Sequence, residues 1–220
     1  MKYEAVLFDL DGVLLKSMEQ HLEAWQHAFS RFRAKVNESD FYQLEGRGVR
    51  SVVEILTEKY GIDSKYRQAL TDDKVAYYNS NFKEEFYDGI YHLLDTLRNN
   101  TIKMAVVTGG MRDRVHKIIE EYFKEYFSAI ITSDDVEKTK PYPEPYLKAA
   151  ALLKVRPEEC IVVENAPMGI KSGKAAGMRV IAICTTLDKK YLQEADVIVD
   201  TFFEMQNHLI VEEKINCNTS

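Results

Sequence analysis

The stretch Phe8-Asp9-Leu10-Asp11-Gly12-Val13-Leu14 determines how the rest of the chain is interpreted. It continues the apolar run Ala5–Phe8, which is typical of a buried strand. Asp9 and Asp11 stand at positions i and i+2, so on a continuing strand both carboxylates would leave the end of the sheet on the same face. Two carboxylates held close together repel each other unless a cation lies between them or one takes a proton. The alternative is a strand that ends in a solvated Asp-Gly turn.

Composition places the chain among ordinary soluble globular proteins. It has 220 residues, of which 45% are hydrophobic and 29% charged, enough for one large domain or two small ones. The net charge of -6 argues against nucleic-acid binding, which relies on a basic face. An acidic pair this early leaves no room for a signal peptide, and no apolar run approaches the length of a membrane span. We therefore expect a cytoplasmic protein without a membrane partner, and Cys160, Cys184 and Cys217 suit a reducing compartment.

The pattern changes after residue 15 and again near residue 88. The first change begins a helical stripe through Met18, Leu22, Trp25 and Phe29, with Ser17 as a possible N-cap. Further helical patterns follow at residues 52–60 and 64–81, and no convincing strand interrupts them. Beyond residue 88, helices alternate with apolar runs at residues 103–107, 129–132, 160–163, 180–184 and 197–199.

This alternation predicts the α/β class, with a Rossmann-like, doubly wound parallel sheet covered by helices on both faces. The expected core consists of residues 1–15 and 82–220. Residues 16–81 are expected to form an all-α cap subdomain inserted after the first strand. The polar tail after about residue 211 is expected to fray.

Polar residues stand where the expected strands end, which is where doubly wound sheets bind ligands. Taken one at a time, these residues could be a capped turn or a solvated lysine. Together they supply a nucleophile, oxygen donors for Mg²⁺ and a cationic clamp, as phosphoryl transfer requires. Neither GxxxxGK[ST] nor GxGxxG after a strand is present, which argues against nucleoside triphosphate and dinucleotide binding. The strand ends carry, in chain order, Asp9 and Asp11, then Thr108-Gly109-Gly110, then Lys140-Pro141, and then Glu164-Asn165.

In order and spacing, these segments resemble the four motifs of the haloacid dehalogenase-like hydrolase superfamily, the fourth motif covering residues 164–178. The resemblance extends over essentially the whole chain. The helical insertion resembles the cap of the branch that contains β-phosphoglucomutase-like and phosphoglycolate-phosphatase-like proteins.

The resemblance implies a role for each motif. Asp9 would attack phosphorus and form an aspartyl-phosphate, while Asp11 would protonate the leaving oxygen and later deprotonate water. Thr108 and Gly109 would bind the transferring phosphoryl group, and Lys140 would neutralise charge between the phosphate and the nucleophile. Mg²⁺ would be held by Asp9, the carbonyl of Asp11 and the Glu164/Asn165 pair.

Two positions depart from the family pattern. The family usually has an aspartate where this chain has Asn165, and the neutral amide should weaken the grip on Mg²⁺. In the cap loop, Glu45 stands where β-phosphoglucomutases tend to have a lysine or arginine. We hypothesise that Glu45 reaches Mg²⁺ and offsets the charge missing at Asn165. The alternative is a solvated loop glutamate.

Four further cap residues are candidates for substrate binding. His21 and Trp25 are i, i+4 neighbours that match a His/Trp pair of β-phosphoglucomutase-like sequences, and Lys74 lies near the position of a cap lysine in those mutases. His21 could instead serve packing alone. Arg47 and Arg50 could bind a distal phosphate or could be solvated.

The sequence therefore favours a monomeric, Mg²⁺-dependent phosphohydrolase acting on a small phosphorylated metabolite, either sugar-phosphate-like or pyrophosphate. The alternative is a β-phosphoglucomutase-type phosphotransferase, against which Glu45 argues. A non-enzymatic binding protein is disfavoured because Asp9, Asp11, Thr108 and Lys140 occur together. Dehalogenation does not need the second aspartate, so Asp11 favours a phosphate substrate.

Overall fold

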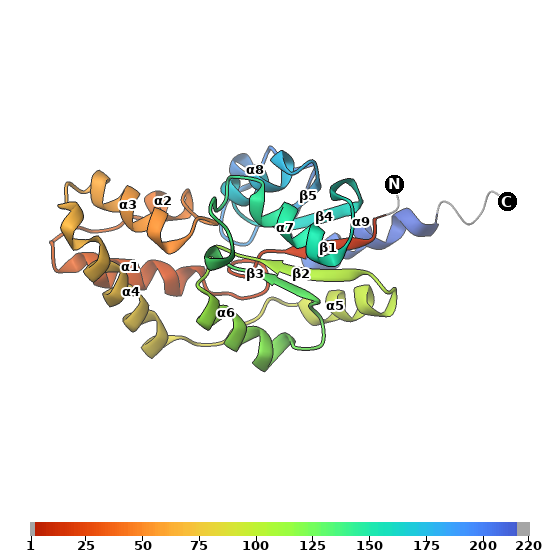
Figure 1. Cartoon of the computed structure of the whole chain (residues 1–220), viewed down its shortest axis with the longest axis horizontal. Helices are drawn as coiled ribbons and strands as arrows, with labels where there is room; N and C mark the ends of the chain where they lie inside the picture. Colours follow the sequence, from red (N-terminus) through yellow and green to blue (C-terminus); the bar gives the residue numbers. More distant parts are fainter. Residues whose placement is uncertain (1–2, 215–220) are drawn as a thin grey trace.

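The computed structural model describes residues 3–214, with side chains through Leu209, and is built around one parallel sheet. The strand order is β3-β2-β1-β4-β5-β6, which places the strand before the aspartate pair in the centre (Figure 1). Cys217 lies outside the described residues, as does the end of the polar tail that is expected to fray. The strands are β1 (Ala5–Phe8), β2 (Lys103–Val107), β3 (Ala129–Ile131), β4 (Cys160–Glu164), β5 (Arg179–Ile183) and β6 (Val197–Val199).

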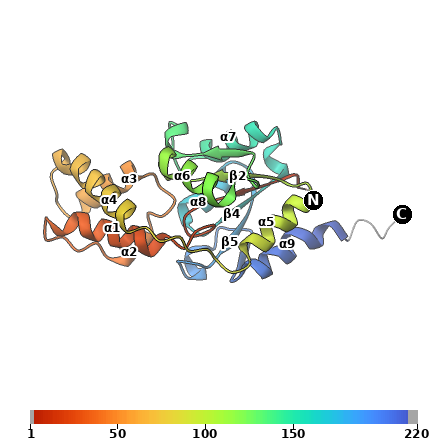
Figure 2. The same cartoon turned by 90° about the horizontal axis from the view of Figure 1, so that it is seen from below.

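Helices cover both faces of the sheet, because alternate residues of each strand point in opposite directions. In β1, Val6 and Phe8 join the apolar cluster that contains α5, α6 and α9. Ala5 and Leu7 join the other cluster, with α7 and α8 (Figure 2). The predicted doubly wound α/β class is confirmed. These helices are α5 (Ile90–Asn99), α6 (Arg112–Ile118, continued by a π-helical turn at Ile119–Phe123), α7 (Glu144–Leu153), α8 (Pro167–Ala175) and α9 (Phe202–Lys214).

A helical unit is inserted between β1 and β2, and it lies beyond the carboxyl edge of the sheet (Figure 1). It has its own apolar core around Trp25, Phe29, Leu56 and Leu70. Its two connections to the sheet run together, since the backbone N–H of Lys16 donates to the carbonyl of Glu85 at 2.8 Å. The inserted helices are α1 (Met18–Ser30), α2 (Glu38–Tyr42), α3 (Val49–Lys59) and α4 (Arg67–Asn81).

The structure differs from the sequence-based expectations at three places. Helices α2 and α9 were not predicted; α2 has only five residues, and α9 shows its periodicity only through Phe202, Met205 and Leu209. The prediction that Ser17 caps α1 is wrong, because its side chain makes no capping hydrogen bond. Its hydroxyl donates to Asp11 instead. Within residues 3–214, none of the helices combines the length and apolarity needed to cross a bilayer.

Candidate active site

A cavity of about 210 Å³ lies between the carboxyl edge of the sheet and the inserted helices. Parallel pairing brings its polar residues together: the N–H of Asp9 bonds to the carbonyl of Val163, and that of Thr108 to Ile131. Lys140, Glu164 and Asn165 are buried in the same region. The predicted residues that line the cavity are Asp9, Asp11, His21, Glu45, Arg47, Lys74, Thr108 and Gly109.

Lys140 joins two buried carboxylates. Its Nζ donates to Asp9 Oδ1 at 2.7 Å and to Glu164 Oε1 at 2.6 Å. Burial would lower the pKa of Lys140, but the two acids raise it above the usual value, so the ammonium stays charged. Burial raises the pKa of Asp9 to about 7, with Lys140 opposing the rise and Glu164 adding to it. The ammonium therefore stabilises an Asp9 carboxylate that burial alone would neutralise.

Glu164 is fully hydrogen-bonded from within the core. Besides Lys140, the hydroxyl of Tyr146 donates to its Oε1 at 2.9 Å. The backbone N–H groups of Asn165 and Ala166 donate to its Oε2 at 3.0 and 3.2 Å. This carboxylate holds Lys140 in place beside Asp9.

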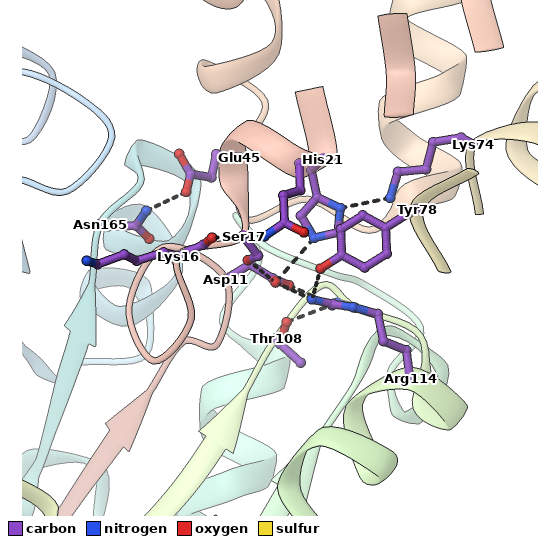
Figure 3. Close-up of polar contacts among 12 residues, drawn as sticks. Asp11, Lys16, Ser17, His21, Glu45, Lys74, Tyr78, Thr108, Arg114 and Asn165 are labelled. Carbon is purple, nitrogen blue, oxygen red and sulfur yellow. Dashed lines mark hydrogen bonds and ion pairs between the residues drawn. The ribbon is translucent and has the colours of Figure 1, made fainter. Parts of the chain in front are cut away.

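Asp11 is held by donors from both the sheet side and the inserted helices (Figure 3). Arg114, on α6, binds both carboxylate oxygens, with Nη1 at 2.9 Å from Oδ2 and Nη2 on Oδ1. The Ser17 hydroxyl also donates to Oδ1, and His21 Nε2 lies 3.2 Å from it. Burial would raise the pKa of Asp11, but Arg114 and His21 hold it well below its usual range. In this arrangement Asp11 is an ionised carboxylate that can accept a proton.

His21 and Lys74 form a buried pair on the cap side of the cavity (Figure 3). Burial and the neighbouring Lys74 lower the pKa of His21 to about 3, so its ring is neutral. Lys74 Nζ lies 3.0 Å from Nδ1, which makes Nδ1 the acceptor and leaves Nε2–H to donate to Asp11. Tyr78 stacks on the imidazole with the ring centroids 4.2 Å apart and also receives a hydrogen bond from Arg114. His21 is thus packed and hydrogen-bonded to Asp11 at once.

Glu45 reaches from the cap loop to the core and is buried. Its Oε1 accepts a hydrogen bond from Asn165 Nδ2, and its Oε2 accepts one from the Thr186 hydroxyl at 2.9 Å. The solvated-glutamate alternative is therefore wrong. Gly12 makes room for this contact: its φ is +84°, and a Cβ there would lie 2.0 Å from Asn165 Nδ2. Glu45 fixes the amide so that nitrogen faces the cap and oxygen faces away from it.

The donor set suits a hard divalent cation. Asn165 Oδ1 is buried without a hydrogen-bond partner. Asp9 and the Asp11 carbonyl offer two more oxygens just after β1, which pairs with β4 beside Asn165. Burial raises the pKa of Glu45 well above its usual range, as it raises that of Asp9, so a cation beside these two carboxyl groups would favour their ionised forms. Within residues 3–214, no three His, Cys, Asp or Glu side chains cluster as a metal site. A cation here would need the amide and carbonyl oxygens.

The loop after β2 brings the phosphoryl-binding candidates against the cap. The Thr108 hydroxyl accepts a hydrogen bond from the N–H of Gly110 at 3.0 Å. A Cβ on Gly109 would lie 2.7 Å from the carbonyl oxygen of Arg47, so only glycine allows the cap loop to come this close. The Arg47 side chain lines the cavity, whereas Arg50 is exposed and lies along a different groove.

Four residues of the site were not predicted from the sequence: Tyr78, Arg114, Tyr146 and Thr186. Arg114 stands six residues after Thr108, so a basic residue on the helix that follows the motif was a usable signal. Tyr146 stands five residues after Pro141, and a buried tyrosine needs a partner for its hydroxyl. Tyr78 and Thr186 gave no comparable signal.

Comparison with known proteins identifies the family. The family model described as haloacid dehalogenase-like hydrolase matches residues 6–183. Validoxylamine A 7'-phosphate phosphatase of Streptomyces hygroscopicus subsp. limoneus is 31% identical over 205 residues, covering 93% of this chain and 96% of that protein. Pyrophosphatase PpaX of Bacillus cereus (strain Q1) is 28% identical over 200 residues, covering 89% of each chain.

A solved structure from Bacteroides vulgatus, provisionally assigned as a beta-phosphoglucomutase, superposes with a TM-score of 0.85 at 32% identity. The superposition covers 96% of this chain and 90% of that one. The extent of the family match and the identity to these relatives lead to one conclusion. The chain belongs to the haloacid dehalogenase-like hydrolase family.

Proposed function

We propose that the protein is a Mg²⁺-dependent phosphatase that passes a phosphoryl group from a small metabolite to Asp9 and then to water. The observation that carries the proposal is the Lys140 ammonium on Oδ1 of Asp9, in a cavity that also exposes Asp11 and Thr108. A carboxylate whose ionised form is stabilised by a buried ammonium, with an acid/base group beside it, is suited to nucleophilic attack on phosphorus.

The reaction has two halves. In the first, Oδ2 of Asp9 forms a bond to phosphorus and the bond from phosphorus to the leaving oxygen breaks. Asp11, which must take a proton from solvent before this step because Arg114 and His21 keep it ionised at rest, passes that proton to the leaving oxygen. In the second, Asp11 accepts a proton from water while that water attacks phosphorus, which releases phosphate and restores the Asp9 carboxylate. Thr108 and the backbone N–H of Gly109 bind the oxygens of the transferring group.

The metal would be held by Asp9, the carbonyl of Asp11 and Oδ1 of Asn165. The unpartnered Oδ1 supports this assignment, and the saturated hydrogen bonds of Glu164 favour a supporting role for that residue through Lys140. When bound, Mg²⁺ offsets the repulsion between the phosphate and the nucleophile. Glu45 keeps Oδ1 of Asn165 available by holding the amide nitrogen. Burial raises the pKa of Glu45, and a bound cation would favour its carboxylate form, whose charge would then add to the attraction for the cation.

We further propose that residues 16–81 act as a cap over a core of residues 1–15 and 82–220. Glu45, Arg47, His21 and Lys74 all reach the cavity from this segment. A closed cap would exclude water while the phosphoryl group is transferred and would choose the substrate by its non-reacting part. The paired connections at Lys16 and Glu85 are suited to the hinge.

The proposed substrates are sugar-phosphate-like metabolites or pyrophosphate. The similarity to a validoxylamine A 7'-phosphate phosphatase and to a pyrophosphatase supports this range. The similarity to a protein provisionally assigned as a beta-phosphoglucomutase supports an alternative, in which the phosphoryl group returns to another hydroxyl of the substrate. A phosphatase releases one phosphate per substrate, whereas a mutase yields an isomer with little free phosphate.

A phosphate-release screen over sugar phosphates, nucleotides, phosphoglycolate and pyrophosphate, with Mg²⁺ and with EDTA, tests the proposal. We expect stoichiometric phosphate from at least one class in Mg²⁺ and none in EDTA. Phosphate release that survives in EDTA would contradict the metal requirement. Isomer formation without phosphate would favour the mutase.

A further inference from the structure

The buried polar atoms that lack partners point to one cavity. Among the described residues, the buried side-chain nitrogen and oxygen atoms without a hydrogen-bond partner are Oδ1 of Asn165 and the Nε atoms of Arg47 and Arg114. The first fits the proposed metal. Both arginines line the cavity between the cap and the core. A buried donor without an acceptor is unfavourable, so both Nε–H groups call for an acceptor that a ligand would bring.

Arg114 can serve a ligand without giving up its present contacts. Its two Nη atoms bind Asp11, and Nη2 also donates to the Tyr78 hydroxyl at 2.9 Å. The remaining donors, Nε–H and one N–H of Nη1, are not used by these bonds. The guanidinium also contacts the Tyr78 ring, with its carbon 4.9 Å from the centroid, which holds it at the boundary between core and cap.

The position of Arg114 indicates which part of a substrate it meets. Lys140 and Thr108 serve the reacting phosphoryl group in the proposed function, and Asp11 serves the leaving oxygen. Because Arg114 is bonded to both oxygens of Asp11, it faces the leaving group of the substrate. Arg47 reaches the same cavity from the cap loop, where its Nη1 has only a long 3.4 Å hydrogen bond to the Ser51 hydroxyl.

Lys74 adds a third basic group on this side, although burial lowers its pKa to about 7. Lys74 is buried beside neutral His21, and its Nζ lies 5.6 and 4.9 Å from the ring centroids of Trp25 and Tyr78. Its near neighbours are thus an imidazole and two aromatic rings. A negative group in the cavity would complement both guanidinium groups and would favour the protonated form of Lys74, whereas an uncharged group would leave the two Nε–H donors facing a weaker acceptor.

We propose that the cavity takes phosphate compounds with a second anionic group, and that Arg47 and Arg114 determine this specificity by binding that group. The inference rests on the proposed function for the orientation of the substrate. It selects Arg47 over Arg50 as the residue for a distal anion, and it assigns Arg114 a contact with substrate. The second group is either a phosphate or a carboxylate.

Binding to the Asp9→Asn variant tests the inference without turnover. Calorimetric titration in Mg²⁺ would compare two matched pairs: phosphoglycolate with 2-hydroxyethyl phosphate, and pyrophosphate with methyl phosphate. Each pair differs in the second anionic group, and comparison of the pairs separates carboxylate from phosphate. In at least one pair, we expect the member with the second anionic group to bind at least ~10-fold more tightly, which equals about 1.4 kcal/mol.

Arg47→Met and Arg114→Met, each added to Asp9→Asn, should remove most of this preference. Each should change the affinity for the member that lacks the second anionic group by less than about threefold. Arg114→Lys should keep part of it, since charge remains but the forked geometry is lost. Arg50→Met and Arg112→Met are the matched controls, because both side chains are exposed and lie outside the cavity lining; the preference should survive in both. Thermal melts establish that each variant is folded.

Equal affinity for both members of both pairs, or equal weakening of both members by Arg47→Met and Arg114→Met, would overturn the inference. Phosphate release by the unmodified protein is measured separately. A preference that depends on the arginines, in a protein that releases no phosphate, would support the anion site and contradict the proposed phosphatase.

Discussion

Replacement of Lys140 by methionine tests the charge balance beneath the cavity. The Lys140 side chain is 1% exposed, and its partners Asp9 and Glu164 are 4% and 0% exposed. Methionine of similar length would leave two buried carboxylates without their ammonium. Removal of one partner from a buried ion pair costs about 3–5 kcal/mol. In a protein of this size each kcal/mol lowers Tm by roughly 2–4 °C, so we expect Tm to fall by about 6–20 °C at pH 8.

The loss of stability should depend on pH with a defined sign. The pKa of Asp9 is about 7 in the folded protein, above its ordinary 3.8, mainly because of burial, and loss of Lys140 would raise it further. The folded state then binds more protons than the unfolded state between these values, so stability falls as pH rises through this window. The deficit of Lys140→Met relative to the unmodified protein should therefore be larger at pH 8 than at pH 5.

The assay is thermal and chemical unfolding in EDTA from pH 5 to 8. Lys171→Met is the control, because Lys171 pairs with Glu194 on the surface at 3.5 Å and such pairs contribute about 0–1 kcal/mol. A Lys140→Met deficit as small as that of the control, or one that does not change with pH, would refute the account of the buried cluster. Phosphate release by Lys140→Met should also fall by about 10²–10³-fold.

Three further predictions concern the cap and the metal. Glu45→Gln preserves both hydrogen bonds of residue 45, because the Thr186 hydroxyl can accept as well as donate. The Mg²⁺ affinity measured by titration should nevertheless fall about 10-fold or more. An unchanged affinity would contradict a charge role for Glu45. Asn165→Asp restores the acid usual in the family but places it against Glu45, so the metal-free protein should lose about 2 kcal/mol of stability at pH 8. Adding Glu45→Gln or Mg²⁺ should recover that loss in unfolding experiments. Gly109→Ala places a methyl 2.7 Å from the Arg47 carbonyl and should raise KM for phosphate release by displacing the cap loop, whereas Gly48→Ala, whose nearest contact is 3.4 Å, should not.

Local patterns were enough to predict the sheet and the motif residues. Each of these patterns depends only on residues that are close together in the sequence. They are the apolar run before Asp9, the periodicity change at Met18 and the alternation after residue 88. Because parallel strands end at the same edge, Asp9, Thr108, Lys140 and Glu164 could be expected together before any coordinates. Which residue is nucleophile and which is acid came from family resemblance.

Contacts between segments that are distant in the sequence could not be predicted from local patterns. The bond from Arg114 to Asp11 spans 103 positions, and that from Asn165 to Glu45 spans 120. Both depend on how α6 and the cap loop dock, which a periodic pattern does not encode. Ser17 illustrates the same point, since its sequence position suggests a helix cap while the fold gives its hydroxyl to Asp11.

The central claim is that Asp9 carries the phosphoryl group during turnover. Its most direct test is rapid quenching of the protein with the best substrate from the phosphate-release screen, followed by peptide mapping for a hydroxylamine-sensitive acyl phosphate. We expect the phosphoryl group on Asp9 in the unmodified protein, and neither label nor turnover in Asp9→Asn. A phosphoryl group on another residue, or phosphate release undiminished in Asp9→Asn, would contradict the claim.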